Sequence, residues 1–154
     1  MKLKPGDPAP PFTARTTDGS TVSLSDYAGK KLVLYFYPKD GTPGCTKQAC
    51  SLRDHNGEIR ARGAEVVGVS TQDEKSHRRF TDKHQLNFPL LADTDKTVSK
   101  AYGAVGSGGV MGFVMDLAGV ANRITFVIDE QGRIAHVIDK PDCPNHAEEV
   151  LRLL

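Results

Sequence analysis

The feature that most constrains the fold is the run from Lys31 to Tyr37, which is apolar or aromatic after its first residue and stops at Pro38. An apolar run without polar alternation predicts a strand buried on both faces, and proline ends it because proline cannot donate to a strand ladder. Strands of this kind occur in sheets that helices cover on both sides. The run therefore predicts a buried strand over residues 31–37.

The rest of the chain alternates between strand and helix patterns. Strands are predicted at residues 12–15, 21–24, 65–70, 89–92, 125–128 and 134–138, and helices at 43–62, 73–84, 97–102 and 146–154. In the first helix, Ala49, Leu52 and Ile59 mark an apolar stripe. This order predicts a three-layer α/β sandwich with a central mixed sheet and an N-terminal hairpin. With 154 residues, we expect one domain over 1–154.

A cysteine lies where the chain leaves this apolar strand and begins a helix. Thr42 is a good N-cap residue and Pro43 suits the first helical position, so Cys45 falls in the first turn. Unpaired backbone N–H groups and the helix dipole favour a thiolate there. The Thr42 hydroxyl is expected to cap the helix and to direct its proton at the sulfur or at a bound oxygen. The pattern indicates Cys45 as a nucleophile; the alternative is an ordinary small buried residue beside a simple cap.

The second cysteine, Cys50, follows five positions later. If both residues are helical, their Cα atoms lie about 8.7 Å apart, from a rise of about 1.5 Å and a turn of about 100° per residue. A disulfide needs Cα atoms within about 7 Å, so joining the two thiols requires the first turns of the helix to unwind. The alternative is a metal site with His55 as third ligand, although no second cysteine pair is present. Cys143, near two prolines, is expected to be a lone thiol in a turn; the alternative is a second resolving partner for Cys45.

The spacing Pro38-x3-Thr42-x2-Cys45, with Cys50 after it and Arg123 ahead of residues 124–128, resembles the peroxiredoxins. It is most similar to the bacterioferritin comigratory protein, or Q-type, subgroup. The resemblance implies a thioredoxin-like fold in which Cys45 is the peroxidatic nucleophile and Cys50 resolves it. It further implies that Pro38, Thr42 and Arg123 complete the site. The guanidinium suits this role because it is a permanent cation that donates to oxygen.

The implied activity is reduction of hydrogen peroxide or an alkyl hydroperoxide by a thiol-dependent peroxidase that needs no cofactor and no metal. Cys45 becomes a sulfenic acid, Cys50 condenses with it, and thioredoxin or a glutaredoxin-like dithiol restores both. Two other functions stay open: a redox sensor that uses the same switch without efficient turnover, and a thiol–disulfide oxidoreductase. The last usually places its thiols two residues apart.

Composition limits the partners and the compartment. With 20 basic and 19 acidic residues, the chain shows no charge excess for nucleic acid or an anionic membrane. The N-terminus has no apolar signal segment, and the longest uncharged run, residues 101–115, is too short and rich in glycine to span a bilayer. Three cysteines, two closely spaced, suit catalysis in a reducing compartment. We therefore expect a cytoplasmic protein, a monomer or weak homodimer, acting on a small peroxide.

Residues 104–121 depart from the pattern of the subgroup. They contain a glycine-rich run and the apolar segment Val110 to Met115, where charged and aromatic residues are usual. The apolar segment is expected to be core or a subunit contact, with a pocket for organic hydroperoxides as the alternative. The glycines also resemble a phosphate loop, but no lysine follows at the required place.

Overall fold

The computed structural model describes residues 2–105 and 121–154 of the chain. Its main sheet has the strand order β5 (Leu90–Ala92), β4 (Ala64–Ser70), β3 (Lys31–Phe36), β6 (Ile124–Ile128) and β7 (Ile134–Ile138). The first three strands are parallel, and β6 and β7 are antiparallel to their neighbours. The predicted mixed sheet is therefore confirmed.

The remaining elements are helices and a short hairpin. The α-helices are α1 (Pro43–Asp54), α2 (Asn56–Ala61), α3 (Glu74–His84), α4 (Thr97–Ala101) and α6 (His146–Leu151). The hairpin pairs β1 (Thr13–Arg15) with β2 (Thr21–Ser23), and the described residues also contain the 3-10 helices η1 (Leu24–Tyr27) and η2 (Cys143–Asn145). Within the described residues, no helix is long and apolar enough to cross a membrane.

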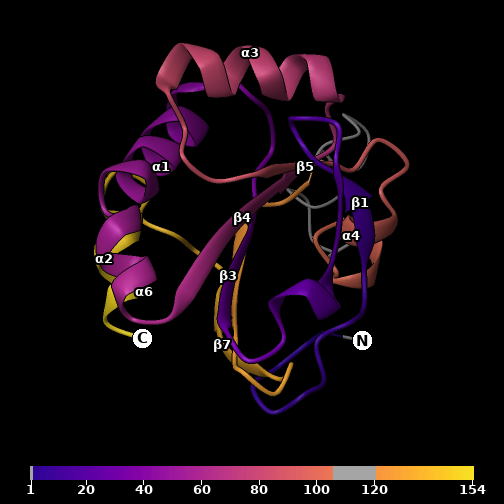
Figure 1. Ribbon diagram of the computed structural model, residues 1–154, viewed down its shortest axis with the longest axis vertical. Helices are drawn as coiled ribbons and strands as arrows, with labels where there is room; N and C mark the ends of the chain where they lie inside the picture. The colour runs from indigo at the N-terminus through magenta and orange to yellow at the C-terminus, as the bar shows by residue number, and fades with distance from the viewer. Residues whose placement is uncertain (1, 106–120) are drawn as a thin grey trace.

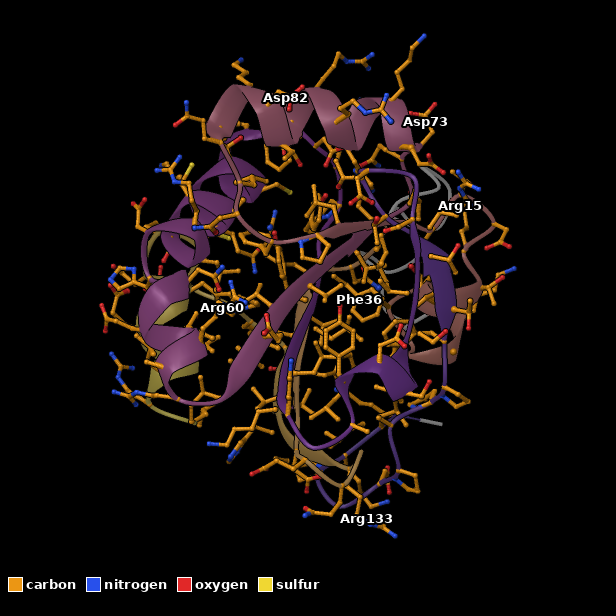
Figure 2. All side chains as sticks on the ribbon, viewed as in Figure 1. Arg15, Phe36, Arg60, Asp73, Asp82 and Arg133 are labelled. Carbon is orange, nitrogen blue, oxygen red and sulfur yellow. The ribbon has the colours of Figure 1, made fainter. Side chains whose placement is uncertain are left out.

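Alternate residues of β3 enter two separate cores. Val33 and Tyr35 pack with α1, α2 and α6, whereas Leu34 and Phe36 pack with β1 and α4. Figure 1 shows these two groups of elements on opposite sides of the sheet, with α3 along the top, and Figure 2 shows Phe36 in the interior. The residues of the core strand, Leu32 to Phe36, are at most 1% exposed. The three-layer sandwich is confirmed, because a strand buried on both faces can form only between two layers.

The helix predicted over 43–62 is in fact two helices, α1 and α2, separated at His55. The side-chain amide of Asn87 donates to the carbonyl of Arg53 at 3.1 Å, in the last turn of α1. The side-chain amide of Asn56 in turn donates to the backbone carbonyl of Asn87 at 3.0 Å. The prediction of one helix was wrong because a residue distant in the sequence binds a carbonyl that a continuous helix would use itself.

The last helix also differs from the prediction over 146–154, because it ends at Leu151. The carbonyl of Leu151 accepts a bond from the Arg62 guanidinium at 2.7 Å, and the final residues form tighter turns. Segment 104–121, including the apolar run predicted as core or contact and the glycines compared with a phosphate loop, lies mostly outside the described residues; only 104, 105 and 121 of it are described.

Candidate active site

Cys45 lies in the first turn of α1, as the sequence predicts. Gly41 has a φ of 81°, a conformation that favours glycine, and it turns the chain after β3 toward the helix. Thr42 has the extended backbone of an N-cap, and its carbonyl accepts the N–H of Thr46 at 2.9 Å. Cys45 is 1% exposed. The thiol is therefore fixed at the positive end of a helix and shielded from water.

The Thr42 hydroxyl does not cap the helix in the way that we predicted. It donates instead to the carbonyl of Lys39 at 2.9 Å, and no side-chain capping bond forms at this helix end. In this structure its proton is therefore directed at the loop and not at the sulfur. The physical reason is that the loop 38–42 folds back on itself, which places the Lys39 carbonyl within reach of the hydroxyl.

Arg123 reaches the sulfur of Cys45 from a different part of the chain. Phe36 at the end of β3 pairs with Ile124, so Arg123 lies just beyond the end of β3. Its Nη2 donates to Cys45 Sγ at 3.3 Å, and its Nη1 donates to Gln48 Oε1 at 2.7 Å. A fixed guanidinium beside a buried sulfur stabilises the thiolate by charge and by hydrogen bonding.

Sequence reasoning missed Gln48, which is fully buried and holds the guanidinium. The signal that was present is its spacing, because residues three apart lie on one face of a helix and Gln48 follows Cys45 by three. Tyr35 was also missed. Burial raises the pKa of Tyr35 well above its ordinary value, and the charge of Cys45 adds to the shift. Tyr35 therefore stays a neutral phenol close to the thiolate.

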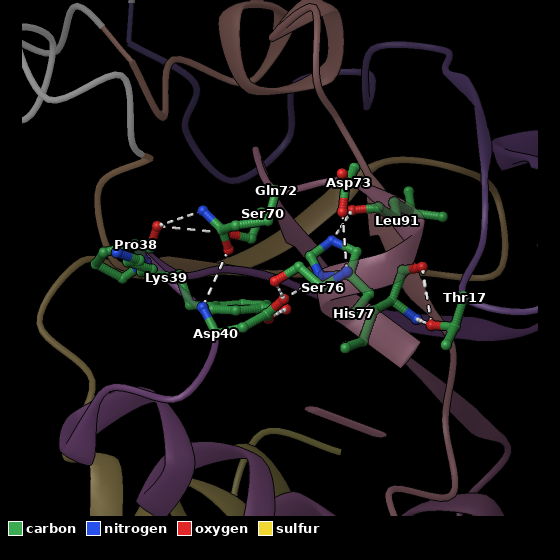
Figure 3. Close-up of polar contacts among 12 residues, drawn as sticks. Thr17, Pro38, Lys39, Asp40, Ser70, Gln72, Asp73, Ser76, His77 and Leu91 are labelled. Atoms are coloured by element: carbon green, nitrogen blue, oxygen red, sulfur yellow. Dashed lines mark hydrogen bonds and ion pairs between the residues drawn. The ribbon is translucent and has the colours of Figure 1, made fainter. Parts of the chain in front are cut away.

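Asp40 fixes the loop between β3 and α1 through a buried polar network (Figure 3). Its carboxylate accepts bonds from the hydroxyls of Tyr37 at 2.6 Å and Ser76 at 2.8 Å, and it contacts His77 Nδ1 at 2.6 Å. His77 Nε2 lies 2.9 Å from the carbonyl of Leu91 and must be the donor there, because a carbonyl only accepts.

The contact between Asp40 and His77 therefore contains a proton, which makes it a hydrogen bond of the ring to the Asp40 carboxylate. Burial alone would raise the pKa of Asp40, but the hydrogen bond and charge of His77 and the bonds from Tyr37 and Ser76 hold it below its ordinary value. This pair fastens the loop to the start of α3, whose first turn contains His77.

The same loop is held at Pro38 by Gln72. The side-chain amide of Gln72 donates to the Pro38 carbonyl at 3.2 Å, while its oxygen accepts the N–H of Asp40 at 3.0 Å (Figure 3). The Gln72 side chain thus hydrogen-bonds two backbone groups of the loop. The loop that leads to Cys45 is positioned by β4 and α3 as well as by its own sequence.

The two other cysteines, Cys50 and Cys143, lie in different elements: Cys50 in α1 itself, and Cys143 in a turn that packs beside α1. Cys50 lies in α1 with Cys45, so the separation that a helix imposes on their Cα atoms applies. Cys143 begins η2 and was predicted to be a lone thiol in a turn. Cys143 is a free thiol in this turn, as predicted, and its Sγ lies 3.9 Å from the point where a Cβ on Gly44 would be.

The residues of the alternative metal site have other partners. His55 Nδ1 contacts the carbonyl of Ser51 at 3.0 Å, and its Nε2 lies 3.5 Å from a carboxylate oxygen of Glu148. Over residues 2–105 and 121–154, no three His, Cys, Asp or Glu side chains form a group able to hold a metal.

Gly44 is expected to be required for activity and not for folding. A Cβ at this position would lie 3.2 Å from Arg123 Nη2, which forces the guanidinium to shift. Alanine is the better helix former by up to about 1 kcal/mol, so Gly44→Ala should keep or raise the free energy of unfolding in urea. The rate of peroxide reduction should nevertheless fall by about tenfold, as one hydrogen bond to the sulfur is weakened. An unchanged rate would show that the position of the guanidinium tolerates this shift.

Comparison with known proteins places this site in a family. The family model described as AhpC/TSA matches residues 5–137. The chain is 44% identical over 152 residues to peroxiredoxin Bcp of Escherichia coli K12, covering 99% of this chain and 96% of that protein.

Two solved structures are similar over nearly the whole chain. A PrxQ cysteine-to-serine mutant from Xylella fastidiosa has a TM-score of 0.88 and 30% identity, covering 99% of this chain and 95% of that one. The bacterioferritin comigratory protein of Xanthomonas campestris, studied for its alkyl peroxide reduction, has a TM-score of 0.81 and 30% identity, covering 92% and 88%. The site has a thiol at a helix start with a guanidinium bonded to its sulfur, and the similar proteins are peroxiredoxins. The chain therefore belongs to the AhpC/TSA family and is a peroxiredoxin of the Bcp and Q type.

Proposed function

We propose that this peroxiredoxin reduces hydrogen peroxide and alkyl hydroperoxides with Cys45 as the nucleophile. The observation that carries the proposal is the bond of 3.3 Å from Arg123 Nη2 to Cys45 Sγ at the start of α1. The alkyl peroxide reduction studied in the Xanthomonas campestris relative supports the wider substrate range. A thiolate, and not a thiol, is the nucleophile, and this contact favours the thiolate.

In the first step the Cys45 thiolate attacks one peroxide oxygen. A sulfur–oxygen bond forms, the oxygen–oxygen bond breaks, and the second oxygen leaves as hydroxide or alkoxide and takes up a proton. Cys45 is thereby oxidised to a sulfenic acid, and the product is water or an alcohol. The Arg123 guanidinium stabilises the charge that develops on the leaving oxygen. Pro38 is expected to shield the sulfur from water, and the prediction that the Thr42 hydroxyl directs its proton at a bound oxygen requires it to leave its present acceptor, the Lys39 carbonyl; both roles stay predictions.

In the second step Cys50 condenses with the sulfenic acid, which forms a disulfide and releases water. Both residues lie in one continuous helix, so this step requires the first turns of α1 to unwind. Gly44 lowers the cost of unwinding, because glycine in a helix costs up to about 1 kcal/mol relative to alanine. Thioredoxin or a glutaredoxin-like protein then reduces the disulfide. This reductant, the cytoplasmic location and the monomer or weak homodimer remain predictions.

The proposal is tested by treating the native chain, Cys45→Ser and Cys50→Ser with one equivalent of hydrogen peroxide. Peptide mass spectrometry should find a Cys45–Cys50 disulfide in the native chain and, with dimedone present, a Cys45 adduct in Cys50→Ser. In a coupled assay with thioredoxin and its reductase, Cys45→Ser should lose peroxide consumption down to the uncatalysed rate, because serine is a far weaker nucleophile. Normal consumption by Cys45→Ser, or a sulfenic acid on another cysteine, would contradict the assignment.

A further inference from the structure

The thiols of Cys45 and Cys143 both lie near Gly44, beside the guanidinium of Arg123. Its Nη2 lies 3.3 Å from Cys45 Sγ and 3.2 Å from the Cβ position of Gly44, and Cys143 Sγ lies 3.9 Å from that same position. A Cβ lies about 1.5 Å from its Cα and neighbouring Cα atoms lie about 3.8 Å apart, so Cys143 Sγ is within about 9 Å of the Cα of Cys45. The missing side chain at Gly44 leaves room for both groups.

The turn that carries Cys143 is anchored to the sheet and to α1 just after η2, whereas before η2 the N–H of Asp142 donates to Glu149 Oε1 at 2.8 Å. Immediately after η2, the N–H of Ala147 donates to the hydroxyl of Ser51 on α1 at 3.0 Å. His146 Nε2 contacts the Thr125 hydroxyl at 2.9 Å, which fastens the same point to β6. Before this anchor the chain is a three-residue 3-10 helix with exposed residues on each side of Cys143, whose own side chain is half-buried. The bonds that hold Asp142 before η2 stay within this turn and α6, so the turn can approach Cys45 without breaking a bond to the sheet.

We propose that Cys143 is a second resolving thiol, which attacks the Cys45 sulfenic acid from η2 while α1 stays wound. This inference rests on the proposed function, because it requires the sulfenic acid that peroxide forms on Cys45. The Cys143 sulfur forms a bond to the Cys45 sulfur, the sulfur–oxygen bond of the sulfenic acid breaks, and the hydroxide leaves with the thiol proton as water. Cys143 is oxidised in this step, and an external dithiol reduces the disulfide afterwards.

The charges around Cys143 favour its ionisation after Cys45 has been oxidised. Burial raises the pKa of Cys143, and the charge of Arg123 opposes this shift. The negative charge of Cys45 raises the pKa further, with smaller contributions from Asp142 and Glu149. When peroxide converts the Cys45 thiolate to a neutral sulfenic acid, this repulsion disappears and the attraction of Arg123 remains. Cys143 therefore ionises more easily at the stage when its target is present.

The two resolving thiols would serve different states of α1. Cys50 reaches Cys45 only if the helix unwinds, whereas Cys143 comes from a separate segment that already contacts the first turn. The Cys143 route leaves the backbone hydrogen bonds of α1 in place. A chain with both routes forms a disulfide before a second peroxide can oxidise the sulfenic acid further.

The test compares Cys50→Ser with Cys50→Ser/Cys143→Ser after one equivalent of hydrogen peroxide. The single variant should form a Cys45–Cys143 disulfide within one chain, identified by mass spectrometry of a non-reduced digest. Its Cys45 sulfenic acid, trapped by dimedone at timed intervals, should disappear at least about tenfold faster than in the double variant, since a neighbouring thiol competes with slow hydrolysis or overoxidation. Thermal unfolding of both variants checks that they share one fold.

Equal lifetimes of the sulfenic acid in the two variants would overturn the role of Cys143, and so would a disulfide found only between chains on a non-reducing gel. Both results leave the proposed function intact, because the dimedone adduct on Cys45 still forms. Absence of any Cys45 adduct in the double variant would instead overturn the proposed function, and with it this inference.

Discussion

Replacing Arg123 with methionine is expected to lower kcat/KM for hydrogen peroxide by about 10²- to 10³-fold, the usual effect of removing one preorganised donor from a developing anion. Methionine fills similar space without charge. The loss has two sources: Nη2 bonds to Cys45 Sγ in the structure, and in the proposed mechanism the same group stabilises the leaving oxygen. Both the supply of thiolate and the stability of the transition state therefore fall.

Arg123→Lys is the matched control. An ammonium keeps the charge but cannot bond to Cys45 and Gln48 together in the geometry of the planar guanidinium. We expect Lys to recover only part of the lost rate. Stopped-flow kinetics with peroxide measures kcat/KM, and the pH dependence of iodoacetamide labelling reports the thiolate separately. A methionine variant within a few-fold of the native rate would show that Arg123 is not part of the chemistry.

Asp40→Ala is expected to lower the free energy of unfolding by about 3–5 kcal/mol, the cost of breaking a buried charge pair from one side. The substitution leaves the ring of His77, which is fully buried, without its carboxylate partner. The hydroxyls of Tyr37 and Ser76 lose their acceptor at the same time. Urea unfolding at pH 7 measures the loss, and a change below about 1 kcal/mol, the value typical of surface pairs, would contradict it.

The pH dependence of this loss gives a second check, with Asp40→Asn as the variant of equal size. The folded state holds the pKa of Asp40 below the ordinary value of 3.8. The carboxylate therefore stabilises the fold fully above that value, and this stabilisation is lost as the pH falls further, through the folded pKa. The difference in unfolding free energy between the native chain and Asp40→Asn should be largest near neutrality and should shrink below the ordinary value.

The sequence alone was sufficient for features that depend on local pattern. The bounds of the buried strand β3 and the start of α1 at Pro43 were predicted within one or two residues. The alternation of strands and helices correctly predicted a mixed sheet. The buried stripe of Ala49, Leu52 and Ile59 was also correct. These features could be predicted from the sequence because hydrophobic periodicity and helix capping depend on a few neighbouring residues.

The features that were missed depend on contacts between distant segments. Nothing near Asp40 indicates that His77 will bind it, and nothing near Gly44 indicates that Cys143 will pack beside it. The Arg123 contact with Cys45 was predicted only through the resemblance to a family, because the two residues are 78 positions apart. Such pairings are decided by the register of strands and the packing of layers, which a single sequence does not display.

The interruption between α1 and α2 determines how far a change at Cys45 can spread. Helix formation is cooperative along a continuous run of hydrogen bonds, so melting one end of a long helix weakens the whole of it. Here Asn87 binds the carbonyl of Arg53, and Asn56 begins a new helix that it ties to Asn87. The twelve residues of α1 thus form a cooperative unit of their own. In the proposed mechanism, oxidation would unwind α1 while α2 stays packed on β4, so the redox cycle would be reversible without unfolding the domain.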